Sequence, residues 1–135
     1  MLQKLENVSS ILYPLDPSKQ PVDYYRGIAN YYLSNYKAAL NNFLLARKLA
    51  PFNPIILNNV AAAYETLGNL DSAIVSFEKL RKLFPNYVKP QVNLLRLYFE
   101  KGKGDKAELL FDELNAKYPN NPSLLELRNR YHPNE

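Results

Sequence analysis

Residues 54–87 read PIILNNVAAAYETLGNLDSAIVSFEKLRKLFPNY, and this stretch decides the fold. Two helical segments lie on either side of Gly68-Asn69, residues that accept the left-handed backbone found at helix ends. Pro54 suits the first turn of a helix, whereas Pro85 cannot continue one. The stretch therefore predicts two helices, roughly 54–67 and 71–83, joined by a turn.

The same pattern recurs before and after this stretch, with a period of 34 residues. Residues that recur in register are Pro51, Pro85 and Pro119; Ala39, Ala73 and Ala107; and Phe43, Phe77 and Phe111. The flanking segments predict helices at roughly 22–33, 36–49, 88–101 and 105–117. Asp71 and Asp105 suit the starts of their helices, because a side-chain oxygen can accept hydrogen bonds from the free N–H groups there and the negative charge meets the positive end of the helix dipole.

This period, with its Ala, Phe and Pro spacing, resembles the tetratricopeptide repeat. The resemblance implies an all-α fold, a right-handed superhelical solenoid of three helix-turn-helix repeats with an N-terminal helix and a C-terminal capping helix. The expected boundaries are 1–19 for the N-terminal helix and linker, 20–53, 54–87 and 88–121 for the three repeats, and 122–135 for the capping helix and tail.

The eighth position of each repeat differs in size along the chain. Gly27 and Ala61 are small and allow two helices to approach closely, whereas Leu95 occupies the same place in the third repeat. We expect this departure to loosen or shift the packing near Tyr98.

The resemblance implies a non-catalytic protein–protein interaction module, an adaptor or scaffold that binds a peptide or helix in the concave groove lined by the first helix of each repeat. The expected groove residues are Tyr24, Ile28, Tyr31, Asn58, Asn59, Glu65, Lys89, Asn93 and Arg96. Tyrosine offers contact area with few rotors, and asparagine amides can bond to a peptide backbone.

Other features limit this interpretation. Helical spacing allows only some of the tyrosines at positions 24, 25, 31 and 32 to face the groove, and Tyr36, Tyr64 and Tyr98 are expected to fill the core. Members of the family that bind chaperone tails hold a terminal carboxylate with Lys, Arg and Asn residues. Only Asn59 and Lys89 match that set here, so the carboxylate clamp is incomplete.

Catalytic and metal-binding chemistry has little support in the residues. The chain has no cysteine, and its one histidine, His132, lies in a tail that we expect to be frayed and exposed. No nucleophile elbow or phosphate-binding loop is present. The sequence predicts no catalytic residue, no metal site and no cofactor.

Composition and the N-terminal sequence indicate the compartment in which the protein is expected. Hydrophobic residues make up 47% of the chain, but the longest apolar runs are far short of the roughly 20 residues of a membrane-spanning helix. The N-terminus lacks the pattern of a signal peptide. We therefore expect a soluble chain without a transmembrane segment, cytoplasmic by default.

Three alternatives remain open at this stage. The segments Tyr24–Gly27 and Asn53–Ala61 resemble the C-terminal repeats of membrane-embedded O-antigen ligase or polymerase proteins, which implies a soluble appendage of a glycan-assembly protein and a periplasmic or extracytoplasmic setting. Positive residues between Glu78 and Lys106 could bind nucleic acid, but this ranks last because the aromatic residues cluster elsewhere, in the first repeat. Apolar faces at the ends of the array would allow self-association.

Overall fold

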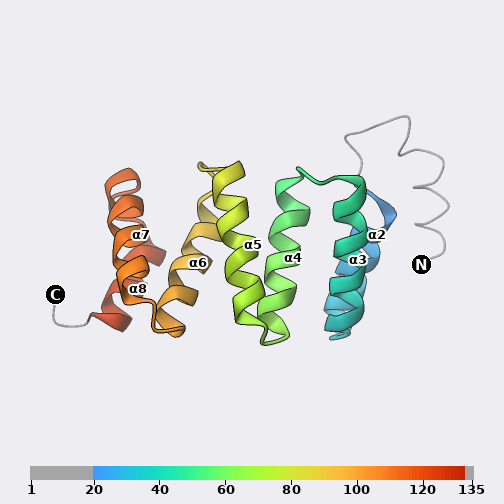
Figure 1. Ribbon diagram of the computed structural model, residues 1–135, viewed down its shortest axis with the longest axis horizontal. Helices are drawn as coiled ribbons and strands as arrows, with labels where there is room; N and C mark the ends of the chain where they lie inside the picture. Colours follow the sequence, from blue (N-terminus) through green and yellow to red (C-terminus); the bar gives the residue numbers. More distant parts are fainter. Residues whose placement is uncertain (1–19, 133–135) are drawn as a thin grey trace. The chain divides into compact units, whose positions relative to one another are not determined.

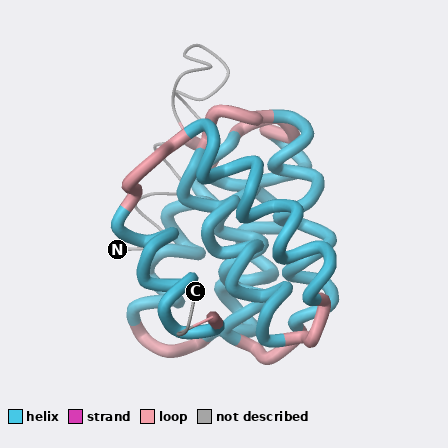
Figure 2. The backbone as a smooth tube through the Cα atoms, turned by 90° about the vertical axis from the view of Figure 1, so that its left-hand side faces the viewer, coloured by secondary structure: helices cyan, strands magenta, loops and turns pink. Residues whose placement is uncertain are grey.

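A computed structural model describes residues 20–132, which contain helices and short turns and no strand (Figure 2). Seven helices follow one another in this part of the chain (Figure 1): α2 (Val22–Tyr32), α3 (Tyr36–Leu49), α4 (Pro54–Thr66), α5 (Leu70–Leu83), α6 (Val88–Glu100), α7 (Gly104–Lys117) and α8 (Pro122–Tyr131). The predicted helix and linker at 1–19 and the tail at 133–135 lie outside the described residues. Two compact units divide the chain between Ser76 and Phe77, within α5.

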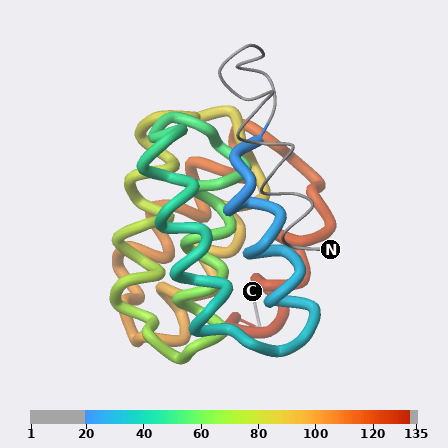
Figure 3. The backbone as a smooth tube through the Cα atoms, turned by 90° about the vertical axis from the view of Figure 1, so that its right-hand side faces the viewer, coloured from blue at the N-terminus to red at the C-terminus, as the bar shows by residue number. Residues whose placement is uncertain are grey.

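The first unit is built on the pair α2 and α3, which lie side by side (Figure 3), and α3 also packs against α4. Its core cluster consists of Ala39, Phe43, Val60 and Ala63. A polar contact links the first two helices, because Asn30 donates to the Oδ1 atom of Asn42 at 2.8 Å. The apolar cluster thus holds α4 to the pair that precedes it.

Asparagine residues cap two of the helices. The Oδ1 atom of Asn53 accepts hydrogen bonds from the N–H groups of Ile55 and Ile56 at 3.0 and 3.2 Å, and Pro54 follows at the first turn. Asn121 caps α8 in the same way, with Pro122 next to it. Each cap stabilises its helix by about 1 kcal/mol.

The capping roles predicted for the two aspartates are wrong. At the start of α5, Asn69 accepts the hydrogen bond from the N–H group of Ser72 at 3.3 Å, and Asp71 lies in the first turn. The residue that precedes α7 is Lys103, whose side chain makes no capping bond, and Asp105 again lies in the first turn. Both carboxylates lie where their negative charge meets the positive end of the helix dipole.

Close packing of α2 on α3 depends on Gly27. A Cβ atom added there would lie 2.4 Å from the Cε1 atom of Phe43, far inside van der Waals contact. The absent side chain leaves room for the Phe43 ring, which is only 2% exposed.

The equivalent pair in the second unit is arranged differently. Leu95 is fully buried, and Phe111, which corresponds to Phe43, is only half-buried and lines a cavity. The helices α6 and α7 also pack less closely than α2 and α3. The predicted loosening therefore occurs at Phe111 and not at Tyr98, which is 7% exposed.

Tyr98 is held in the second unit by a hydrogen bond and by burial. Its hydroxyl group donates to the Oε1 atom of Glu78 at 2.7 Å. Burial, and then the hydrogen bond and negative charge of Glu78, raise the pKa of the Tyr98 hydroxyl well above its ordinary value. The hydroxyl stays protonated and keeps donating through the neutral pH range.

Candidate functional site

The four tyrosines of α2 divide into two pairs. Tyr24 and Tyr31 pack against the core cluster of the first unit. Tyr25 and Tyr32 turn outward and are 40% and 85% exposed. The predicted groove residues Tyr24 and Tyr31 therefore present only part of their rings to solvent, and burial raises the pKa of the Tyr24 hydroxyl, with a smaller effect from Tyr25.

The Tyr31 hydroxyl connects α2 to the end of α4. It lies 2.8 Å from the Oγ1 atom of Thr66, and Thr66 in turn donates to the carbonyl oxygen of Ala62 at 2.9 Å. Because the Thr66 hydrogen is used for that carbonyl, Tyr31 is the donor to Thr66. Tyr36 contacts the Tyr31 ring edge-on, with centroids 5.1 Å apart. These contacts fix the Tyr31 ring between the two helices.

One face of α4 remains accessible along its length. We call it the α4 stripe, and its half-buried or exposed members are Ile55, Asn58, Asn59, Ala62, Glu65 and Thr66. The residues between them, such as Ile56, Val60 and Ala63, are buried. The stripe follows helical spacing, and it contains three of the residues predicted for the groove.

Asn58 is the unusual member of the α4 stripe. Its Oδ1 atom is buried and accepts no hydrogen bond from any residue in the described part of the chain. A buried amide oxygen without a donor costs about 1–3 kcal/mol of stability. Such atoms are rare in folded proteins, and a donor supplied by a ligand would remove the cost.

The second unit repeats this pattern on α6. Its accessible residues are Lys89, Val92, Asn93, Arg96, Phe99 and Glu100. Arg96 forms an ion pair with Glu100 at 3.0 Å, so an acidic ligand would compete with this carboxylate.

The nine predicted groove residues divide between the two units. Lys89, Asn93 and Arg96 belong to the second unit, and the other six belong to the first. In the first unit, Ile28 packs against the core cluster, as Tyr24 and Tyr31 do.

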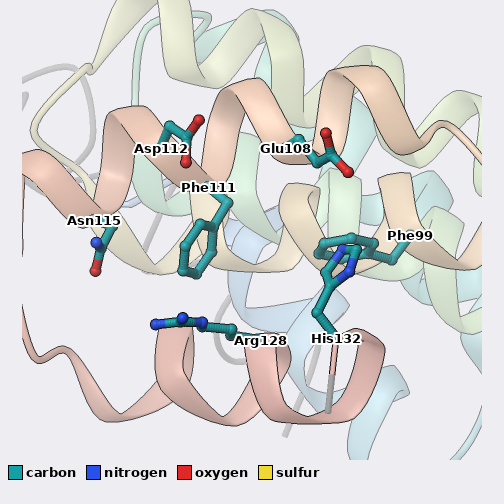
Figure 4. A pocket seen from close by; sticks show the side chains of 7 residues that line it. All are labelled: Phe99, Glu108, Phe111, Asp112, Asn115, Arg128 and His132. Atoms are coloured by element: carbon teal, nitrogen blue, oxygen red, sulfur yellow. The ribbon is translucent and has the colours of Figure 1, made fainter. Parts of the chain in front are cut away.

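The second unit also contains a cavity of about 400 Å³ that sequence reasoning missed (Figure 4). It is lined by Phe99 from α6, by Glu108, Phe111, Asp112 and Asn115 from α7, and by Arg128 and His132 at α8. The predicted exposed tail histidine is wrong, because His132 is half-buried and contacts the Phe99 ring at 5.7 Å between centroids. Leu95 is the sequence signal that could have pointed to this region.

No group of three or more His, Cys, Asp or Glu side chains is placed to hold a metal ion among residues 20–132. None of the helices in the same range has the length and apolar character needed to cross a membrane.

Comparisons with known proteins identify the repeat. The family model described as Tetratricopeptide repeat matches residues 64–131. No curated protein matches the sequence.

Solved structures with the same fold are numerous. The first TPR of Spaghetti (RPAP3), bound to the HSP90 peptide SRMEEVD, is 20% identical with a TM-score of 0.73, and the match covers 83% of this chain and 89% of that one. The Arabidopsis OM64 TPR domain is 21% identical with a TM-score of 0.73, covering 83% and 93%.

A third structure is the Yersinia enterocolitica type III secretion chaperone SycD in complex with a peptide of the translocator YopD. It is 19% identical with a TM-score of 0.68, covering 82% of this chain and 85% of that one. At these identities the matches concern the fold, and they confirm the predicted all-α repeat class.

Proposed function

The chain belongs to the tetratricopeptide repeat family, and from this premise we propose that it binds a peptide or a helix of a partner protein along the α4 stripe. The fold is that of a protein-interaction module, and two structures that share it contain a bound peptide, one from HSP90 and one from YopD. The partner of this chain is a protein whose segment lies against Asn58 and Asn59.

The observation that carries this proposal is the Oδ1 atom of Asn58. It is a buried acceptor on a residue that is itself partly exposed on the α4 stripe, and no described residue donates to it, so a partner would reach it after a rotation of the Asn58 side chain. A peptide offers a backbone N–H group at every residue except proline, so it is a suitable donor. Asn59, the next residue of the α4 stripe, adds a second amide with both donor and acceptor groups.

The α2 side of this face would contribute contact area. Tyr25 is 40% exposed, and the Tyr31 ring is fixed by Thr66 and Tyr36. A fixed ring loses little conformational entropy when a partner binds. On the second unit, Lys89, Asn93 and Arg96 of α6 are proposed separately as peptide contacts, with Lys89 as the exposed cation.

The test begins with peptides selected from a random library on the wild-type chain. For a selected peptide, Asn58→Ala should weaken binding about tenfold, as expected for a lost hydrogen bond in an interface. The same substitution should leave stability unchanged or raise it by about 1 kcal/mol, because it removes an unsatisfied oxygen and introduces a better helix former.

A matched control removes an asparagine elsewhere. Asn41 is exposed on α3, and Asn41→Ala should change neither peptide affinity nor stability appreciably. Equal affinities of the Asn58→Ala, Asn59→Ala and Asn41→Ala variants for every selected peptide would exclude binding along the α4 stripe. A loss of stability in Asn58→Ala would instead assign that residue a structural role.

A further inference from the structure

The cavity of the second unit has a mixed lining that defines what it can hold. Its volume of about 400 Å³ is in the range of small-ligand and side-chain pockets. Two aromatic rings, Phe99 and Phe111, lie between α7 on one side and α8 on the other (Figure 4). The cavity thus combines apolar ring surface with charged walls.

The two rings differ in how much of their surface is available. Phe99 is stacked on Tyr131, with centroids 4.5 Å and planes 7° apart, and His132 contacts it edge-on. Phe111 has no ring contact with any residue in the range 20–132 and points from α7 toward Arg128 (Figure 4). Phe111 is therefore the lining ring whose exposed part no other aromatic ring covers.

The α7 wall carries two carboxylates one helical turn apart. Glu108 and Asp112 are exposed, and within the described part of the chain neither forms an ion pair. Residues at this spacing lie on the same helix face. Together with Arg128, these two acidic groups leave the cavity lining with one excess negative charge, which favours a cation over an anion on the α7 side.

We propose that this cavity binds one cationic side chain, arginine in preference to lysine, presented by a partner polypeptide. A guanidinium group can stack on the Phe111 ring and donate to carboxylates through its planar fork, whereas an ammonium group has no flat face. Arg128 on the α8 wall repels positive charge, so the guanidinium group of the occupant lies against the α7 wall. The site depends on the proposed function only in that a polypeptide carries the cation.

The experiment uses the full chain labelled with ¹⁵N and the capped tripeptide acetyl-Ala-Arg-Ala-amide. Saturable amide shifts should appear at Phe111, Asp112 and their neighbours, with a dissociation constant on the order of 1 mM, because exposed charges contribute weakly. The citrulline tripeptide, which keeps the shape and removes the charge, should bind about tenfold more weakly. The lysine tripeptide should fall between them.

Substitutions in the cavity lining test whether the arginine tripeptide binds there. The double variant Glu108→Gln/Asp112→Asn should lower the affinity for the arginine tripeptide about tenfold. The control Asp105→Asn/Glu113→Gln removes the same charge from the same helix outside the cavity lining, and it should lower affinity less than about twofold.

Three results would overturn the proposal. Equal binding of the arginine and citrulline tripeptides would show that no cation site exists, as would equal effects of the two double variants. Methylguanidinium that binds as tightly as the tripeptide would identify a site for a small cation and exclude the polypeptide occupant. Asn58→Ala should leave arginine binding unchanged, so a failure here is distinct from a failure of binding at the α4 stripe.

Discussion

The pairs α2–α3 and α6–α7 occupy equivalent places in the repeat, yet they pack differently. In the first, Gly27 leaves the space that the Phe43 ring fills, and the ring is 2% exposed. In the second, Leu95 is fully buried, and Phe111 lies half-buried at the wall of a cavity. One side chain at the eighth position is thus associated with a closed core in one pair and an accessible ring in the other.

The largest effect is expected from removing the two phenylalanine rings. Phe43→Ala should lower the free energy of unfolding by about 4 kcal/mol, because the ring is buried in a close-packed core. Phe111→Ala should lower it by about 2 kcal/mol, because that ring is only partly buried. Urea unfolding measures both variants.

The difference between the two losses in the free energy of unfolding is the quantity that tests the comparison of the two pairs. Equal losses would mean that Phe111 contributes as much packing as Phe43, against the difference in burial. Phe43→Leu, with an expected loss of about 1.5 kcal/mol or less, provides a folded reference if the alanine variant is too unstable to measure.

The next effect concerns the space beside Phe43. Gly27→Ala should lower the free energy of unfolding by about 2 kcal/mol, because the new Cβ atom would lie 2.4 Å from the ring. Helix propensity alone predicts a gain of about 1 kcal/mol for this change. The sign of the measured change in unfolding free energy therefore shows whether the clash with Phe43 or helix propensity dominates. Thermal and urea unfolding give that sign.

Gly104 supplies the control for this substitution. A Cβ atom at Gly104 would have no neighbour within 4 Å. Gly104→Ala at the start of α7 should therefore be neutral or stabilising by about 0.5 kcal/mol. Destabilisation by both variants to the same extent would show that the Phe43 contact is not the cause.

Leu95→Ala should make the second pair more like the first. We expect a loss of about 2 kcal/mol, at the low end for a buried leucine, because Phe111 can move into the space that Leu95 leaves. The same movement should weaken binding of the arginine tripeptide. A loss of about 4 kcal/mol or more, with the NMR signals of the Phe111 ring unchanged, would show that the leucine does not control the position of the ring.

The smallest effect concerns the hydroxyl group of Tyr98. Tyr98→Phe should lower the free energy of unfolding by about 1 kcal/mol, because Glu78 loses its donor. The pKa of Tyr98 is raised on folding, so its contribution is present below the unfolded value of 10.0 and decreases as the pH rises above it.

The variant should accordingly show a smaller decrease in stability between pH 9 and 11 than the wild-type chain does, as measured by urea unfolding at each pH. Tyr32→Phe, at a side chain that is 85% exposed, controls for loss of a hydroxyl group. An identical pH dependence in wild type and Tyr98→Phe would contradict the role assigned to the Tyr98–Glu78 hydrogen bond.

The candidate site could be predicted only in part. Helical spacing predicted that only some of the four tyrosines of α2 could face the groove. The structure shows Tyr25 and Tyr32 exposed, whereas Tyr24 and Tyr31, the two chosen for the groove, pack against the core cluster. The cavity was not predictable in the same way, because Phe99, Phe111 and Arg128 come from three helices and meet only through their packing. The spacing of residues within one helix does not indicate which residues of other helices will pack next to them.

The sequence by itself determined the helices, their turns and the repeat, because these depend on local chemistry. Gly68 adopts a positive φ of 80° after α4, and Pro54 and Asn53 begin that helix, as residues of these types do in any context. The tertiary structure alone decided that the Asn58 oxygen has no donor among residues 20–132 and that Phe111 is only partly buried. Burial and hydrogen-bond satisfaction depend on neighbours far apart in the chain, and no local pattern specifies those.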